Sequence, residues 1–489
     1  MIAPSPRPLP QPGRRGQPLQ AKSAVRGLRA TVWIRETLAS RDQILPYPAP
    51  YRRISTYFWF ATLLFFAGVY VDIPIRLSET AAFPMVSALP GLALLLFHPG
   101  VVTGRTVRFV LLPSLFVLVM GVLAPNPLYY AIVRLIGAGQ TGFSALMGFV
   151  AAWVLARCGR NRLHKFLAIA LPVFLVLIFV EVILPQAHTL MLGYLKIYGY
   201  DLDLDALANR EDTLGGYRPK LFTSEPSYVA TSAMLMVIGY VWTGNDFRRY
   251  LVALMFTVLA AIIIRSPIIL LAIPPIVLAV YTDRALGRFR SVSSFWVTLG
   301  IFGALSLIVV VGAGVIASRF NAALSGDDYS TTYRTYGAIA VAIAVLQRYP
   351  LFGIGAGSIA LVKNTIISTY LSFGVPLEAT ETEWHQSINN AYAAVPMYFG
   401  AVGTGIVLLA LWRLFRSDVA KPRLPVVLAF LGYCITYGGI YTPKFVITMA
   451  VMLTVAKMRP AAMPERFANM ARRRPGVRML AGVARQARR

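Results

Sequence analysis

The sequence is poor in charged residues, above all acidic ones, and in cysteine. Charged side chains make up 14% of its 489 residues, and 20 Asp and Glu stand against 47 Lys and Arg. A chain that is 57% hydrophobic, with a mean hydropathy of +0.63, cannot place most of its residues in water, which excludes a soluble globular enzyme. Two cysteines, Cys158 and Cys434, support neither a disulfide framework nor a cysteine metal site.

The basic excess, a formal net charge of +27, is concentrated in two polar tails. Residues 1–53 hold ten Lys and Arg against two acidic residues, and residues 457–489 hold ten against one. Aromatic residues do not alternate with the basic ones as single-strand binding requires, so nucleic acid is not predicted as a partner. We interpret residues 1–53 and 458–489 as disordered cytoplasmic tails held near anionic membrane lipids.

Between the tails, residues 54–457 contain apolar runs that approach the length needed to cross a bilayer, about 20 residues each. They predict an all-α polytopic membrane protein with about twelve transmembrane helices and no cleavable signal peptide. The predicted spans are residues 56–74, 81–98, 107–124, 138–156, 166–184, 227–243, 250–264, 267–281, 295–317, 390–411, 425–441 and 445–456.

The distribution of basic residues predicts the orientation. Every second loop is basic, for example the one with Arg157, Arg160, Arg162 and Lys165, as the positive-inside rule expects of cytoplasmic loops. Both termini are therefore predicted to be cytoplasmic. Two large loops, about residues 185–226 and 318–386, are predicted to lie on the outer side.

The first outer loop ends in GGYRPKLFTSEPSYVA, which contains Arg218 and Glu225. This places both residues at the outer end of a predicted helix. Glu225 would face the outer vestibule, or would only stabilise the dipole of the helix that begins near Pro226. The alternating acids from Asp201 to Asp205 lack the glycine and the terminal glutamate of a calcium loop, so no metal site is predicted.

Arg265 lies between two apolar runs in AAIIIRSPIILLAIPP, with almost no loop around it. A charged residue at such a position is costly unless it pairs or faces a watery cavity, so a functional role is favoured. The alternative is an interfacial arginine whose side chain extends to the lipid headgroups.

The second outer loop contains an apolar run, residues 338–346, that is too short to span and is ended by Tyr349 and Pro350. We expect a helix packed on the outer face of the bundle, with Arg334 near its start. The following GIGAG, Gly353 to Gly357, lacks the strand and the lysine of a nucleotide-binding loop. Its glycines favour a tight turn or a close backbone approach to a ligand.

His385 stands just before the tenth predicted helix, after Glu378, Glu381 and Glu383. An imidazole that titrates near neutrality, beside carboxylates that orient it, is suited to act as a general base. Helix capping at the interface is the alternative. Arginine forks bind phosphate oxygens, so the outer arginines predict a lipid-linked diphosphate as the ligand.

These motifs resemble those of the O-antigen polymerase and ligase superfamily, bacterial inner-membrane glycosyltransferases with a GT-C-type helical fold. The matching pieces are Arg265-Ser266-Pro267, Arg334 followed by PLFGIGAG, the stretch HQSINNAYAAVPMYFGAVG, and FTSEPS after Arg218. Pro267 departs from the family pattern, in which many members have a small residue.

The resemblance implies an undecaprenyl-diphosphate-linked oligosaccharide as donor, with neither metal nor cofactor. Arg265 and Arg334 would bind the diphosphate, His385 would activate the acceptor hydroxyl, and Arg218 and Glu225 would orient sugar. It implies a periplasmic active site in the bacterial inner membrane, with a chain-length regulator and a flippase as possible protein partners.

The leading hypothesis is a polysaccharide polymerase for O-antigen or exopolysaccharide. An O-antigen ligase that uses lipid A-core as acceptor is the alternative. A flippase for lipid-linked oligosaccharide belongs to a different class, and Arg134 and Glu181, within apolar runs, are the residues that would favour it.

Overall fold

The computed structural model describes residues 55–71, 74–76, 82–184, 186–187, 189–190, 193, 218–223, 226–244, 246–285, 303, 329–384, 388–416 and 424–458. All of these residues belong to one of the two units into which the chain divides, Pro48–Arg489. Apart from a short antiparallel ribbon, β1 (Pro74–Arg76) with β2 (Ala82–Pro84), the regular elements of this part of the chain are helices. Ile75 pairs with Phe83 at the centre of the ribbon.

The α-helices are α2 (Thr56–Val71), α3 (Met85–Leu96), α4 (Gly104–Leu123), α5 (Ala131–Cys158), α6 (Arg160–Ile183), α9 (Pro226–Thr243), α10 (Arg248–Ile264), α11 (Ile273–Ala285), α13 (Tyr329–Arg334), α14 (Tyr336–Arg348), α15 (Lys363–Ser372), α16 (Leu377–Glu383), α17 (Ala391–Arg416), α18 (Leu424–Thr436) and α19 (Pro443–Met458). Three 3-10 helices join them, η1 (Pro99–Val101), η3 (Pro267–Ala272) and η4 (Ile359–Val362).

Four helices in the described ranges, α4, α5, α6 and α17, are long and apolar enough to cross a membrane. Shorter apolar helices cover Thr56–Val71, Ile268–Asp283, Tyr336–Arg348 and Leu424–Thr436. These helices indicate a membrane protein. The count of about twelve spans stays a prediction, and most of the predicted span 295–317 lies outside the described residues.

Local sequence explains where the helices begin and end. Thr103 and Thr106 form a reciprocal capping box at the start of α4, with Thr106 N donating to Thr103 Oγ1 and Thr103 N to Thr106 Oγ1. Gly159 separates α5 from α6 with a positive φ of 74°, which glycine adopts without steric cost.

α5 is the central helix of the bundle. In its apolar window 78% of the residues are buried, against 22% in α4 and in α6, so these two helices present most of their surface to lipid. Small residues let neighbours approach α5 closely. A Cβ added to Gly148 would lie 2.9 Å from a Val446 methyl of α19, and one on Gly142 would lie 3.1 Å from Ser114 Oγ of α4.

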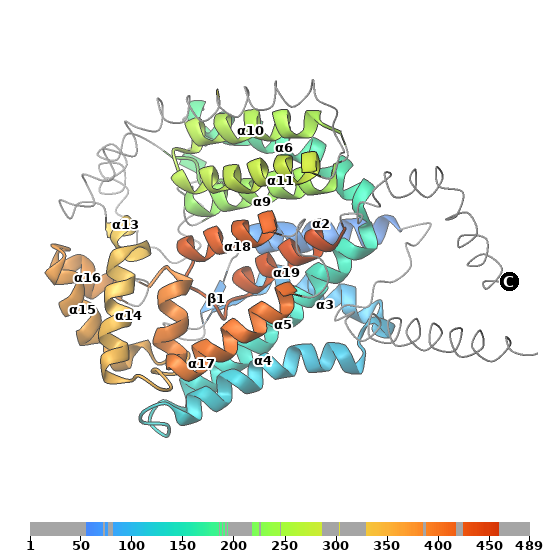
Figure 1. Ribbon diagram of the computed structural model, residues 1–489. Coiled ribbons are helices and arrows are strands. Elements are labelled where there is room, and N and C mark those ends of the chain that lie inside the picture. The colour runs from blue at the N-terminus through green and yellow to red at the C-terminus, as the bar shows by residue number, and fades with distance from the viewer. Residues whose placement is uncertain are drawn as a thin grey trace, which may run out of the picture. The chain divides into compact units, whose positions relative to one another are not determined.

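Figure 1 shows α6, α9, α10 and α11 as one group of helices and α4, α5 and α19 as another. The first group shares an apolar core with α18 and α19. A second core lies among α13 to α17 and the facing residues of α4 and α5. The segment that contains Arg334 is therefore packed on the bundle through its own core.

α17 is two helical pieces that meet at Gly400, whose φ of 60° and ψ of −167° are not helical. The segment after α14 supplies the hydrogen bonds that the break removes. Ala401 N and Val402 N donate to Pro350 O and Leu351 O, while Ile354 N and Gly355 N donate to Met397 O and Tyr398 O. The GIGAG turn thus approaches the backbone of α17. From the sequence, its glycines favour a tight turn or a close backbone approach to a ligand.

Candidate functional site

Arg265 ends α10 in the left-handed conformation, with φ 51° and ψ 37°, and its N–H donates to Ala261 O. Pro267 restricts the preceding Ser266 to an extended backbone, and Ser266 has φ −118° and ψ 125°. A left-handed arginine costs about 1–2 kcal/mol relative to a right-handed helical conformation. The helix therefore ends at an exposed arginine in a strained conformation, which favours a functional role.

Arg218 precedes a short segment that is attached to the end of α6. Both carboxylate oxygens of Glu181 accept backbone N–H groups, Oε1 from Lys220 and Oε2 from Leu221, each at 2.8 Å. Leu221 and Phe222 have positive φ values of 38° and 63°, so the backbone turns sharply here. Glu181 thus positions the segment that carries Arg218.

Replacing Glu181 with glutamine is expected to lower stability by about 1–3 kcal/mol, because the amide NH₂ would face one of the two backbone donors. The measurement is the thermal unfolding midpoint of the purified protein in detergent. Glu381→Gln, at an exposed position on α16, is the matched control and should leave the midpoint unchanged. An unchanged midpoint in Glu181→Gln would show that the carboxylate does not hold the segment.

Arg334 is the last residue of α13, and Thr335 separates it from α14. It therefore lies just outside the helix near whose start we expect it. Its backbone carbonyl accepts a hydrogen bond from Asn390 Nδ2 at 2.8 Å. Asn390 Oδ1 in turn accepts the N–H of Tyr392 in the first turn of α17. One asparagine therefore joins Arg334 to the start of α17.

We call this contact between the end of α13 and the start of α17 the junction. It also includes the motif that contains His385. Asn389, the asparagine of His-x-x-x-Asn, donates its N–H to Tyr333 O at 3.3 Å. His385 and Glu225 themselves lie outside the described residues. Trp384 and Ile388, on either side of the His385 segment, are buried in the same apolar core as Tyr333.

The turn between α18 and α19 packs against this junction. A Cβ on Gly438 would lie 2.8 Å from Asn390 N and nearer still to Ile388 O, so only glycine allows this approach. Within α18, which precedes this turn, Leu431 O accepts a hydrogen bond from the Tyr392 hydroxyl at 2.9 Å. The neighbouring Gly432 faces Leu271 of η3, the helix that follows Arg265. α18 thus contacts both the η3 segment after Arg265 and the start of α17.

An aromatic cluster that the sequence analysis missed lies beside the junction. The rings of Tyr433, Tyr437 and Phe445 are stacked with centroids 5.5–6.3 Å apart. Tyr228, at the start of α9, lies 6.0 Å from Tyr437, and Lys444 Nζ lies 3.8 Å from the Tyr228 centroid. Tyr433 and Tyr437 are four residues apart in the span predicted over residues 425–441, a spacing that predicts one helical face, and this is the signal that the sequence offered.

The hydrogen bonds of Arg134 indicate a structural role. It is 2% exposed, and its guanidinium donates to Ser358 Oγ and to the carbonyls of Gly121, Ala124, Pro125 and Ile354. These five bonds match the five N–H groups of an arginine. Arg134 therefore holds the end of α4 and the GIGAG turn to α5.

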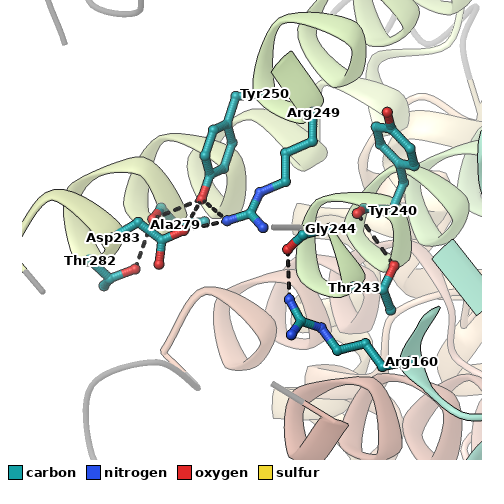
Figure 2. A network of polar contacts seen from close by, with 9 residues as sticks. All are labelled: Arg160, Tyr240, Thr243, Gly244, Arg249, Tyr250, Ala279, Thr282 and Asp283. Carbon is teal, nitrogen blue, oxygen red and sulfur yellow. Dashed lines mark hydrogen bonds and ion pairs between the residues drawn. The ribbon is translucent and has the colours of Figure 1, made fainter. Parts of the chain in front are cut away.

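A second buried polar network lies at the opposite helix ends, where α6 and α10 begin (Figure 2). Arg249 and Asp283, 1% and 0% exposed, form an ion pair that links α10 to α11. The Tyr250 hydroxyl donates to the same Asp283 oxygen, and Arg160 donates to Gly244 O at 2.7 Å. Arg249 is thus neutralised inside the bundle.

Within the described ranges, no group of three or more His, Cys, Asp or Glu side chains is placed to hold a metal ion. The described candidates, Arg218, Arg265 and Arg334, are cationic and suit an anionic ligand. No family model, curated protein or solved structure matches this chain.

Proposed function

We propose that this chain is a membrane glycosyltransferase that polymerises a polysaccharide. It would transfer the growing glycan from undecaprenyl diphosphate to the next lipid-linked repeat unit, on the periplasmic side of a bacterial inner membrane. Both termini would lie in the cytoplasm, and about twelve helices would span the bilayer. A chain-length regulator and a flippase would be its protein partners.

The observation that carries the proposal is the contact between Asn389 and Tyr333. It joins the segment of the proposed base, His385, to the segment of the proposed diphosphate ligand, Arg334, although 51 residues separate the two in the sequence. A base and a leaving-group site must lie near one another for a displacement reaction. The contact supports such an arrangement.

In the proposed reaction, a hydroxyl of the acceptor sugar attacks the anomeric carbon of the donor. His385 accepts the hydroxyl proton, a new glycosidic C–O bond forms, and the bond from the anomeric carbon to the diphosphate oxygen breaks. The diphosphate leaves with the bonding electrons, and the guanidinium groups of Arg265 and Arg334 stabilise its charge. Arg218 and Glu225 would orient the sugars.

The environments of Arg134 and Glu181 argue against the transport alternative. Arg134 donates to four backbone carbonyls and to Ser358 Oγ, and both carboxylate oxygens of Glu181 accept backbone N–H groups. Both charges are therefore engaged within the protein and are not offered to a moving substrate. A ligase would use the same donor and would differ from a polymerase in its acceptor, lipid A-core.

Two experiments test the proposal. The purified protein in vesicles, given only lipid-linked repeat units, should lengthen the glycan without an ion gradient, which a flippase cannot do. A deletion strain should retain a single capped repeat unit and lose long chains. Accumulation of long unattached lipid-linked polymer would instead identify a ligase.

A further inference from the structure

α14 with the segment after it, and the turn between α4 and α5, both carry exposed apolar side chains. Leu128 is 91% exposed, Tyr129 83% and Ile132 74%, and Leu351, just after α14, is 58% exposed. We name these residues, together with Ile339 and Ile343 of α14, the apolar rim. Side chains of this size and number would be costly to leave in water.

Several contacts hold the two parts of the rim together. Arg134 donates to Pro125 O of the α4–α5 turn and to Ile354 O of the segment after α14. In Figure 1 the lower end of α14 accordingly lies beside the turn that follows α4.

α14 contributes one whole face to this surface. Ala338, Val341, Ala342 and Val345 are buried in the core that α14 shares with α17. On the other face Ile339 and Ile343, one helical turn apart, are 45% and 53% exposed. α14 is therefore apolar on both faces over most of its length, which a helix surrounded by water on one side would not be.

The rim continues directly into the surface of a candidate membrane-spanning helix. Val122 and Leu123, in the last turn of α4, are 62% and 50% exposed, and Leu112 at mid-helix is 62% exposed. Residue types of a bilayer interface lie in and beside the rim. Tyr129 of the rim packs on Tyr130, and just before Leu351 the Arg348 guanidinium lies 5.5 Å from the Tyr349 ring centroid. Tyrosine and arginine are favoured at headgroup depth.

We propose that the apolar rim rests in the headgroup and upper acyl region of the bilayer, so that the lobe of α13 to α16 is docked on the membrane by α14 and the α4–α5 turn. The occupant of this surface is lipid. α14 then lies in the interface with one apolar face on the protein core and the other toward lipid, whereas the sequence predicted a helix within an outer loop. The inference does not depend on the glycosyltransferase proposal.

The test uses single cysteines that carry a fluorescent label, introduced into the full chain in lipid vesicles. Cys158 and Cys434 are 5% and 7% exposed, so the wild-type protein gives the labelling background. In Ile343→Cys and Tyr129→Cys, a lipid with a nitroxide near its headgroup should quench most of the fluorescence, and aqueous iodide should quench little.

Two matched controls define the scale. Glu381→Cys, exposed on α16, should be quenched by iodide, and Leu112→Cys should be quenched best by a nitroxide near the end of the acyl chain. Quenching of Ile343→Cys by iodide as strong as that of Glu381→Cys would overturn the proposal. Protection of Ile343→Cys from both quenchers would mean that protein covers the rim, and would overturn it too.

Discussion

Replacing Arg334 with alanine should reduce glycan extension by about 10²–10³-fold, the effect typical of removing one group that stabilises a developing negative charge. The hydrogen bond from Asn390 to the backbone carbonyl of Arg334 does not involve the side chain and should persist in the variant. The measurement is the length distribution of lipid-linked glycan made by the purified protein in vesicles. His385→Ala should be equally inactive, because the acceptor hydroxyl would lose its base.

Further variants separate the chemistry from general damage. Arg334→Lys and Arg265→Lys should also be inactive, since an ammonium cannot make the forked contact of a guanidinium. Arg108→Ala is the control, because Arg108 is an exposed arginine in the first turn of α4 and should keep wild-type activity. Near-wild-type extension in Arg334→Ala or His385→Ala would remove that residue from the mechanism.

Replacing Asp283 with alanine should destabilise the protein by about 3–5 kcal/mol, because it leaves the buried guanidinium of Arg249 without its counter-charge. The ion pair is almost completely excluded from solvent, and Tyr250 would lose an acceptor as well (Figure 2). The expected result is a large decrease in the thermal unfolding midpoint in detergent.

The double variant Arg249→Leu with Asp283→Leu is the informative control for this pair. Removing both charges avoids the uncompensated buried ion, so much of the lost stability should return. If Asp283→Ala alone unfolds at the wild-type temperature, the pair does not hold α10 to α11. Loss of activity without loss of stability would instead suggest a functional role for this end of the bundle.

Elements that depend on local sequence were predicted well. The helix expected at residues 338–346 is α14, Tyr336–Arg348, and it ends before Tyr349 and Pro350 as expected. The span expected at residues 138–156 is longer, because α5 begins at Ala131 and includes Arg134. The predicted span begins after this charged residue. The helix includes it because backbone carbonyls of distant segments accept hydrogen bonds from its guanidinium.

The sequence could not predict the partners of the candidate site residues, because these partners too are backbone groups of distant segments. The span predicted over residues 250–264 corresponds to α10, Arg248–Ile264. Nothing in the sequence shows that Asn390 binds the carbonyl of Arg334 or that Glu181 binds the N–H groups of Lys220 and Leu221. Every residue carries these backbone groups, so they leave no pattern that identifies a partner.

The break in α17 at Gly400 has a consequence for biosynthesis. The carbonyls of Pro350 and Leu351 that bond Ala401 and Val402 emerge from the ribosome before α17 itself. When this helix leaves the translocon, the groups that complete its interrupted ladder are already available, so the bent form need not wait for later parts of the chain. A nascent chain arrested before residue 391 would lack the backbone groups of α17 that bond the segment after α14. Its GIGAG segment should therefore be the part most open to proteolysis.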